Sequence, residues 1–233
     1  MKESPASRRA RARTLIRHLE RAYPEATIAL RFTTPLELLV ATILAAQCTD
    51  ERVNQVTQSL FQKYRRAEDY ARADPATFES EIRSTGFFRA KTRSVLGMAR
   101  ALVERHGGEV PRTLEALTEL PGVGRKTANV VLGNAFGEPG IAVDTHVFRV
   151  TQRLGLAKAD DPDDVEAQLA EVVPRAGWTH FCHLIQAHGR QTCHARMPAC
   201  PVCAVRGLCP WPGKTGGRGA AHPRPALRGR RRP

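Results

Sequence analysis

Apolar side chains recur along this chain at intervals of three and four residues, which is the spacing of helices that turn one face toward a core. Within residues 90–104, Val95, Leu96, Ala99 and Leu102 fall on one face of a helix. Alternating apolar and polar positions, which would indicate half-buried strands, are hard to find. We therefore predict an all-α fold.

Helix start signals divide the chain into segments of helical length. A proline follows a capping residue at Ser4-Pro5, Thr34-Pro35 and Asp74-Pro75, and we expect Asp50 to cap a further helix. Gly107 and Gly108 end the helix over 90–104. The helices that we expect after it cover about 115–119, 127–136, 145–155, 163–172 and 179–188.

Two apolar runs, 130–132 and 141–143, admit a second interpretation as strands. Asn129, Gly133 and Asn134 surround the first run, and these residue types are depleted in strands. A buried helix is therefore the preferred interpretation of that run.

The segment 120–126, Leu-Pro-Gly-Val-Gly-Arg-Lys, separates two of these helices by a tight turn. It predicts a helix-hairpin-helix. Gly122 and Gly124 permit the turn and expose backbone N–H groups beside a helix N-terminus, where the helix dipole attracts an anion such as a DNA phosphate. Such a hairpin grips the DNA backbone and reads no base sequence. Gly122, Gly124 and Arg125 are the expected DNA contacts.

The formal net charge of +13 is concentrated at the two ends of the chain. Residues 1–13 carry +4 and residues 213–233 carry +7, which leaves +2 for the body. A DNA-binding face on the body must therefore be a local patch, while the tails add a salt-sensitive attraction to phosphates. Gly, Pro and Arg dominate the C-terminal tail, so we expect it to be disordered. A merely solvated end is the alternative role.

No apolar run reaches the ~18 residues that a membrane span needs, and the N-terminus lacks the apolar stretch of a signal peptide. We expect a cytoplasmic protein with no membrane partner, associated with the nucleoid if it is bacterial. In such a protein, cysteines are more often metal ligands or free thiols than disulfides.

Four of the six cysteines lie within 17 residues, at Cys193, Cys200, Cys203 and Cys209. Such a density of thiols predicts a metal centre, and the spacing alone fits zinc as well as an iron-sulfur cluster. The other two cysteines, Cys48 and Cys182, lie in apolar helices and are expected to be buried free thiols.

With these motifs together, residues 15–211 resemble the endonuclease III family of DNA glycosylases with AP-lyase activity. The resemblance rests on the segment 45–50 (Ala-Ala-Gln-Cys-Thr-Asp), the hairpin with 124–129, the segment 143–146 (Val-Asp-Thr-His) and the four cysteines. It implies a six-helix bundle with the helix-hairpin-helix at 30–136. It also implies a helical iron-sulfur domain from 14–29 and 137–212, with DNA across the cleft between the two. The segments 1–13 and 213–233 would remain as basic ends.

The resemblance implies that Lys126 is a nucleophile and that Asp144 is the carboxylate that assists it. An amine can attack C1′ of the deoxyribose, expel the base and form an imine, which allows strand cleavage by β-elimination. The neighbouring Arg125 and the helix N-terminus favour the neutral amine that this attack requires. Outside this motif, Lys126 would be interpreted as a solvent-facing charge and Asp144 as a helix cap.

Further roles follow from the same resemblance. Gln47 would fill the gap that a flipped base leaves, where an ordinary surface glutamine is the alternative. The four cysteines would hold a 4Fe-4S cluster. Arg196, between the first two ligands, would contact a phosphate or remain solvated. His146 is given no role, because a lone helix histidine is more often structural.

We therefore expect a monomeric enzyme that excises damaged bases, especially oxidised pyrimidines, from double-stranded DNA and nicks the abasic site. A mismatch-directed thymine or uracil glycosylase of the same superfamily is one alternative. A non-catalytic hairpin module would need neither Lys126 nor Asp144, and a zinc adaptor would leave the hairpin unexplained. A monofunctional glycosylase would carry another residue in place of Lys126.

Overall fold

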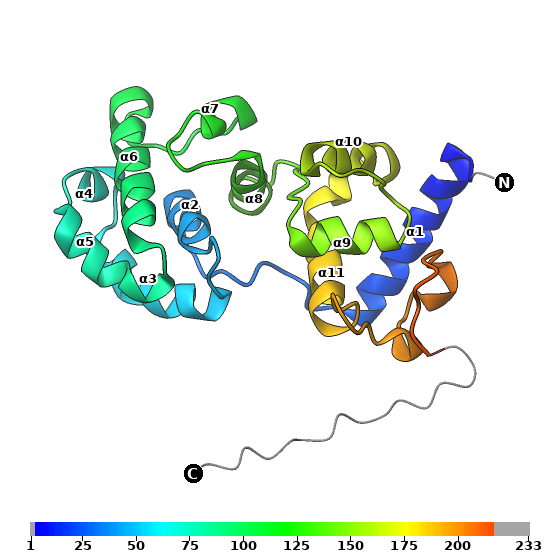
Figure 1. The fold of residues 1–233 in the computed structure, drawn as a ribbon. Helices are drawn as coiled ribbons and strands as arrows, with labels where there is room; N and C mark the ends of the chain where they lie inside the picture. The colour runs from blue at the N-terminus through cyan, green and yellow to red at the C-terminus, as the bar shows by residue number, and fades with distance from the viewer. Residues whose placement is uncertain (1–2, 217–233) are drawn as a thin grey trace, which may run out of the picture.

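The computed structural model describes residues 3–216, and within them every regular element is a helix (Figure 1). The all-α prediction is confirmed. The α-helices are α1 (Pro5–Ala22), α2 (Pro35–Leu44), α3 (Asp50–Lys63), α4 (Ala67–Ala71), α5 (Pro75–Ile82), α6 (Phe88–His106), α7 (Leu114–Thr118), α8 (Arg125–Ala135), α9 (Thr145–Arg153), α10 (Pro162–Val172) and α11 (Trp178–Gln191). Four short 3-10 helices are η1 (Arg83–Thr85), η2 (Arg175–Gly177), η3 (Cys200–Val202) and η4 (Arg206–Leu208).

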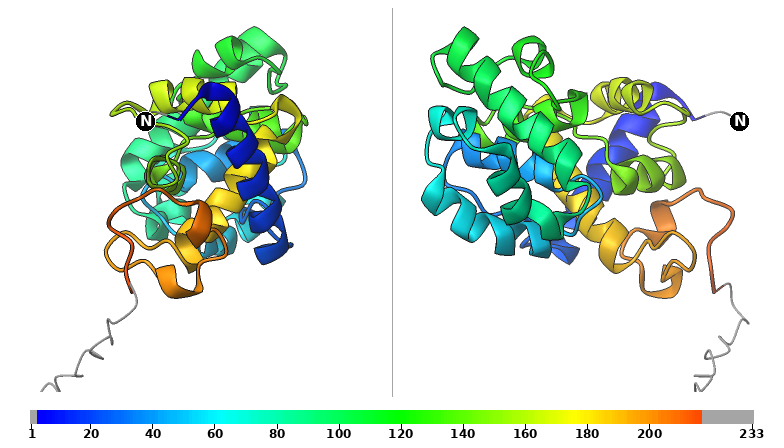
Figure 2. Two further views of the ribbon diagram at one scale, coloured as in Figure 1. Left: turned by 90° about the vertical axis from the view of Figure 1, so that its right-hand side faces the viewer. Right: turned by 60° about the vertical axis from the view of Figure 1, so that its left-hand side comes forward.

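The helices pack around two separate apolar cores. Figure 1 shows the two groups of helices side by side. Helices α2 to α8 surround the first core, and we call this part the bundle lobe. Helix α1, helices α9 to α11 and the C-terminal cysteine segment surround the second core, and we call this part the cysteine lobe. The cysteine lobe therefore combines both ends of the described chain. Figures 1 and 2 both show α1 beside the C-terminal segment.

The apolar run at 141–143 has no regular secondary structure and joins the two lobes without pairing as a strand. Ile141 and Val143 belong to the core of the cysteine lobe, whereas Ala142 belongs to the core of the bundle lobe. One short connecting segment therefore contributes side chains to both cores. The other run, at 130–132, lies within α8 and is buried, as predicted.

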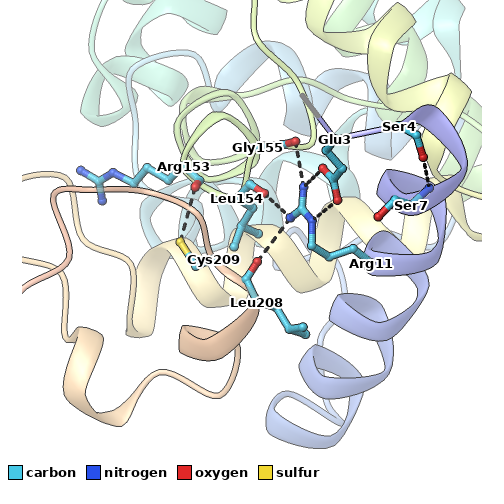
Figure 3. Close-up of polar contacts among 9 residues, drawn as sticks. All are labelled: Glu3, Ser4, Ser7, Arg11, Arg153, Leu154, Gly155, Leu208 and Cys209. Carbon is cyan, nitrogen blue, oxygen red and sulfur yellow. Dashed lines mark hydrogen bonds and ion pairs between the residues drawn. The ribbon is translucent and has the colours of Figure 1, made fainter. Parts of the chain in front are cut away.

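The N-terminal boundary predicted at residue 13 does not correspond to a break in the structure, because α1 runs through it. Ala12 is fully buried, and Arg11 donates hydrogen bonds to the carbonyls of Leu154 at 2.6 Å and Gly155 at 3.1 Å (Figure 3). Glu3 pairs with the same guanidinium at 2.8 Å. Part of the basic N-terminal segment is therefore an anchor of the cysteine lobe.

Three of the predicted caps are confirmed: the side chains of Ser4, Thr34 and Asp74 accept backbone N–H bonds at the starts of α1, α2 and α5. The prediction for α3 is wrong by one residue. Thr49 is its cap, and its hydroxyl accepts the N–H of Arg52. A hydroxyl at that position satisfies the helix start, which leaves the next side chain free for a tertiary contact.

The predicted C-terminal tail, 213–233, lies mostly outside the described residues, which end at 216. Its first residues belong to the folded cysteine segment. Lys214 Nζ donates to the carbonyl of Cys209 at 2.7 Å, and the Thr215 hydroxyl donates to the carbonyl of Pro198 at 2.5 Å. The predicted boundary at residue 213 is therefore too early. Among the helices described, none combines the length and apolar character that crossing a membrane requires.

Candidate active site

A cavity of about 580 Å³ lies between the bundle lobe and the cysteine lobe, and side chains from both lobes line it. Lys126 reaches it from the first turn of α8, and Asp144 reaches it from the position just before α9. The two residues are 18 positions apart in sequence and lie on different elements. The fold thus brings an amine and a carboxylate to the same cavity.

The hairpin that carries Lys126 consists of α7, the turn at 119–124 and α8. Gly122 adopts a φ of 76°, which favours glycine, and a Cβ built there would lie 2.5 Å from Cβ of Ser94 on α6. Gly124 is the N-cap of α8, has an ordinary φ of −92° and has open space around it. Of these two glycines, only Gly122 is required by the conformation and packing of the turn. Gly124 has no side chain that could cap α8, so the first N–H groups of the helix lack a side-chain partner.

Arg125 is bound within the protein. Its Nε and Nη2 donate to the two carboxylate oxygens of Glu166 on α10 at 2.9 and 2.8 Å. This ion pair raises the pKa of Arg125 and offsets its positive charge. Arg125 is therefore not the free neighbouring cation that the sequence suggested. Its contact with DNA stays a prediction, and a phosphate would compete with Glu166 for the guanidinium.

Asp144 caps α9, as its position in the sequence suggests. Its Oδ1 accepts the backbone N–H groups of His146 at 2.9 Å and Val147 at 2.7 Å. Both bonds use the same oxygen, and within residues 3–216 Oδ2 accepts no hydrogen bond. The cap therefore fixes the carboxylate while one oxygen stays available at the cavity. Capping and chemistry are compatible in this geometry.

Two histidines line the cavity, and burial lowers the pKa of both. His146, which the sequence left without a role, lies 3.2 Å from Nη2 of Arg149 through its Nδ1. His183 lies 2.8 Å from Oδ1 of Asn134 through its Nε2, and its pKa falls to about 4. Asn134 donates its amide to the carbonyl of Val130, so its Oδ1 is the acceptor and Nε2 of His183 carries the proton. Both histidines are expected to be neutral at pH 7.

An ion pair connects the lobes at the edge of the same cavity. Arg190 on α11 donates to Oδ2 of Asp50 on α3 at 2.8 Å. Because Thr49 caps α3, the side chain of Asp50 is available for this ion pair. This contact links the two lobes at the cavity that Lys126 and Asp144 also line.

Two non-glycine residues in the described chain have positive φ, Gln47 at 53° and Phe87 at 47°. Gln47 is exposed in the loop between α2 and α3, next to the cavity-lining Cys48. Phe87 follows Gly86, precedes α6 and is 64% exposed. A positive φ at a bulky residue costs free energy, so the surrounding structure must hold the Phe87 backbone in this conformation. Sequence reasoning missed Phe87, although two adjacent aromatics after a glycine at a helix start were a visible signal.

The four C-terminal thiols line one small cavity of about 20 Å³ in the cysteine lobe. Arg153 Nη1 lies 3.3 Å from Sγ of Cys193, and His188 Nε2 lies 3.7 Å from Sγ of Cys203. In residues 3–216, no three acidic, histidine or cysteine side chains are arranged to hold a single metal ion. Sulfur donors beside a guanidinium and an imidazole fit an anionic metal-thiolate group. Arg196 is exposed within this segment.

The two cysteines outside this group are separate from it. Cys182 is buried, and burial raises its pKa to about 12, so the prediction of a buried free thiol is confirmed. Cys48 is free but only half-buried, because the loop that carries it borders the inter-lobe cavity.

Comparison with known proteins gives consistent results. Residues 40–175 match the model of the HhH-GPD superfamily of base excision DNA repair proteins. The chain is 51% identical to endonuclease III of Synechocystis sp. over 88% of this chain and 94% of the relative. It is 40% identical to endonuclease III of Escherichia coli over 84% of this chain and 92% of the relative.

Solved structures resemble the whole arrangement of the two lobes. A non-covalent complex of an endonuclease III with DNA matches with a TM-score of 0.83 at 43% identity, covering 87% of this chain and 95% of the other. A thermostable thymine-DNA glycosylase matches with a TM-score of 0.76 at 23% identity, over 87% of this chain and 96% of the other, which shows likeness of fold alone.

Proposed function

This chain belongs to the endonuclease III family within the HhH-GPD superfamily, and from that membership we infer that it is a base excision repair enzyme, a DNA glycosylase with AP-lyase activity. We propose oxidised pyrimidines in double-stranded DNA as its substrates. The observation that carries the proposal is the shared cavity, where Lys126 and Asp144 meet beside the hairpin. A hairpin module that only held phosphates would need neither side chain there.

Lys126 is proposed to act as the nucleophile. Its neutral amine attacks C1′ of the damaged nucleotide, and the bond from C1′ to the base breaks. The nitrogen then loses a proton and the sugar ring opens at the C1′–O4′ bond, which leaves an imine between enzyme and sugar. Loss of a proton from C2′ then expels the 3′ phosphate, and water releases the amine. Lys126 is exposed in the first turn of α8, where substrate can reach its amine.

Asp144 is proposed to assist each proton transfer and to stabilise the positive charge that develops on the sugar. Its Oδ1 accepts the two cap hydrogen bonds of α9, so Oδ2 is the oxygen that we assign to proton transfer. A carboxylate that two backbone N–H groups already hold loses little further freedom when substrate arrives. The cap thus prepares the catalytic geometry.

DNA is proposed to cross the cleft with one phosphate on the uncapped N–H groups at Gly124 and the start of α8. The damaged base leaves the stack to reach Lys126, and exposed side chains must fill the space it leaves. Gln47 and Phe87 are suited to this, since both are exposed on strained loops of the bundle lobe. Arg196 is a further candidate phosphate contact from the cysteine lobe.

We propose that Cys193, Cys200, Cys203 and Cys209 hold the 4Fe-4S cluster expected of this family. The donor set fits, because four thiols line one cavity with Arg153 and His188 beside two of the sulfurs. When bound, such a cluster supplies a structural and electronic centre, and base excision itself requires no electron transfer. The purified protein should show a visible iron-sulfur absorption band and about four irons per chain. Stoichiometric zinc without iron would refute the assignment.

Borohydride trapping tests the central proposal. A duplex with one oxidised thymine is incubated with the wild type or with Lys126→Ala, and reduction captures any imine as a covalent adduct. We expect an adduct with the wild type and none with the variant, which should still bind the duplex. The catalytic proposal fails if the wild type releases no base from this lesion or from other damaged bases, and forms no adduct with them or with a bare abasic site.

A further inference from the structure

Lys91 is a buried lysine near the start of α6 whose role the proposed chemistry does not explain. Its side chain is 5% exposed. The ammonium donates to the carbonyl of Leu44 at 2.8 Å and to the carbonyl of Thr85 at 2.7 Å. None of the ion pairs found within residues 3–216 includes it. The buried charge is thus held by backbone carbonyls alone.

The position of those two carbonyls explains why a cation is tolerated there. Leu44 is the last residue of α2, and Thr85 is the last residue of η1. The final carbonyls of a helix lack partners within the helix and carry partial negative charge, so a lysine amine can satisfy both ends at once. Burial lowers the pKa of Lys91, as expected for an ammonium without a carboxylate.

The two helix ends lead directly into the two strained loops. Gln47 follows Leu44 by three residues, and Phe87 follows Thr85 by two. The backbone N–H of Lys91 donates to the carbonyl of Phe87 at 3.1 Å, which is the first helical hydrogen bond of α6 and does not depend on the side chain at 91. One ammonium therefore bonds to the residue that ends α2 before the Gln47 loop and to the residue that ends η1 before the Phe87 loop.

We propose that Lys91 is a positioning residue for base opening. Its ammonium holds the Gln47 loop and the Phe87 loop at a fixed spacing, so that both side chains enter the DNA stack together as the damaged base leaves. The inference rests on the proposed function. A hydrophobic side chain of the same length would fill the space and leave both carbonyls without their shared donor. The two loops would then move independently.

The test compares Lys91→Met with the wild type on two duplexes under single-turnover conditions. One duplex contains an oxidised thymine paired with adenine, and the other contains a preformed abasic site, which has no base pair to break. We expect excision of the paired lesion to fall by about tenfold to a hundredfold, as a misplacement of about 1 Å does in other sites. Imine trapping at the abasic site should change by less than about threefold.

A fluorescent base analogue beside the lesion gives a readout that does not depend on chemistry. Insertion of the two side chains unstacks the analogue and raises its fluorescence. The rise should be slower and smaller with Lys91→Met, even in a Lys126→Ala background where no bond breaks. An unchanged fluorescence rise would overturn the proposal.

Two control variants separate positioning from general damage to α6. Thr92→Val changes the next residue, whose buried hydroxyl has no partner within the described chain, and should leave both rates unchanged. Met98→Ala creates a cavity in the same helix, away from both loops. If Met98→Ala reproduces the selective loss on the paired lesion, Lys91 is merely structural.

A double-mutant cycle tests whether Lys91 acts through Phe87. In a Phe87→Ala background the effect of Lys91→Met on the paired lesion should shrink to less than about half, and full additivity would contradict the proposal. Lys91→Gln, whose shorter side chain keeps an amide donor group but no charge, replaces Lys91→Met in the same cycle if the methionine variant is insoluble. A wild type that excises no base refutes the proposed function, whereas an active wild type with an equally active Lys91→Met refutes this inference alone.

Discussion

At the scale of single residues, Asp144 shows how one carboxylate serves the fold and the chemistry through different oxygens. Oδ1 accepts both cap hydrogen bonds of α9, and Oδ2 has none within the described residues. Asparagine caps helices about as well as aspartate because it keeps the accepting oxygen. A substitution that removes only the negative charge of Asp144 can therefore separate its capping role from its proposed catalytic role.

Asp144→Asn is expected to retain the fold and lose the chemistry. The free energy of unfolding should change by less than about 0.5 kcal/mol, since the cap survives. The single-turnover rate of base release should fall by about a hundredfold or more, because the carboxylate no longer assists proton transfer. Asp144→Ala should lose the same activity and also about 1 kcal/mol of stability. Equal activity of Asp144→Asn and wild type would show that the residue is only a cap.

His183 makes stability depend on pH. Burial lowers its pKa from 6.5 to about 4 in the folded state. Below about pH 6.5, His183 becomes protonated in the unfolded chain but stays neutral in the folded protein. The free energy of unfolding therefore falls as the pH drops toward 4. His183→Gln retains a donor for Asn134 and does not titrate.

Urea unfolding at pH 7.5 and pH 5 measures this contribution. The wild type should lose about 1 kcal/mol more than His183→Gln between these pH values, a figure reduced for the partial exposure of the ring. Equal losses in the two proteins would show that His183 titrates normally in the fold.

At the scale of elements, the hairpin uses its two glycines for different purposes. Gly122 has a positive φ and packs against Ser94 of α6. Gly124 occupies the N-cap position of α8, and no atoms lie where its Cβ would be. The first glycine is needed to form the turn, and the second keeps the N-terminus of α8 accessible. The sequence motif alone treats the two as equivalent.

Alanine substitutions should therefore separate folding from DNA binding. Gly122→Ala is expected to cost about 1–3 kcal/mol of stability, because the turn is strained and its Cβ meets Ser94 at 2.5 Å. Gly124→Ala should cost at most about 1 kcal/mol but weaken duplex binding, since a methyl group then covers the uncapped N–H groups. Thermal unfolding and binding titrations measure the two effects. Intact binding by a folded Gly124→Ala would place the phosphate elsewhere.

At the scale of the whole molecule, most of the net positive charge lies away from the proposed catalytic residues. The cleft lies between the lobes, while most of the net charge of +13 lies in the terminal segments. Residues 214–216 are bonded to the cysteine segment, so a deletion that removes only the tail must begin at 217. The segment 217–233 contains six arginines and no acid.

Deleting 217–233 is expected to weaken duplex binding mainly at low salt. Each lost phosphate contact reduces the slope of log K against log salt by about 0.9. Base release under saturating enzyme should be unchanged, because the cavity is intact. Binding titrations at several salt concentrations measure the slope, and an unchanged affinity and slope would show that the tail does not contact DNA.

The sequence by itself determined the features that depend on neighbouring residues. Apolar spacing and capping residues predicted the helices, Gly122 and Gly124 predicted the hairpin, and the motifs indicated the family that the comparisons confirm. These signals are local, because backbone dihedrals and hydrogen bonds within four residues decide where a helix begins and turns. The assignments of Lys126, Asp144, Gln47 and the four cysteine ligands rest on those motifs and stay predictions.

Only the tertiary structure decided which distant side chains meet. Lys91 bonds to Leu44 from 47 residues away, and Arg125 is bound to Glu166 from 41 residues away. No local pattern encodes such contacts, because the packing of whole helices sets them after each helix has formed. For the same reason the sequence did not show that residues 1–13 belong to the cysteine lobe, since Arg11 is held there by the carbonyls of Leu154 and Gly155. The inter-lobe cavity, in which Lys126 meets Asp144, exists only once both cores have assembled.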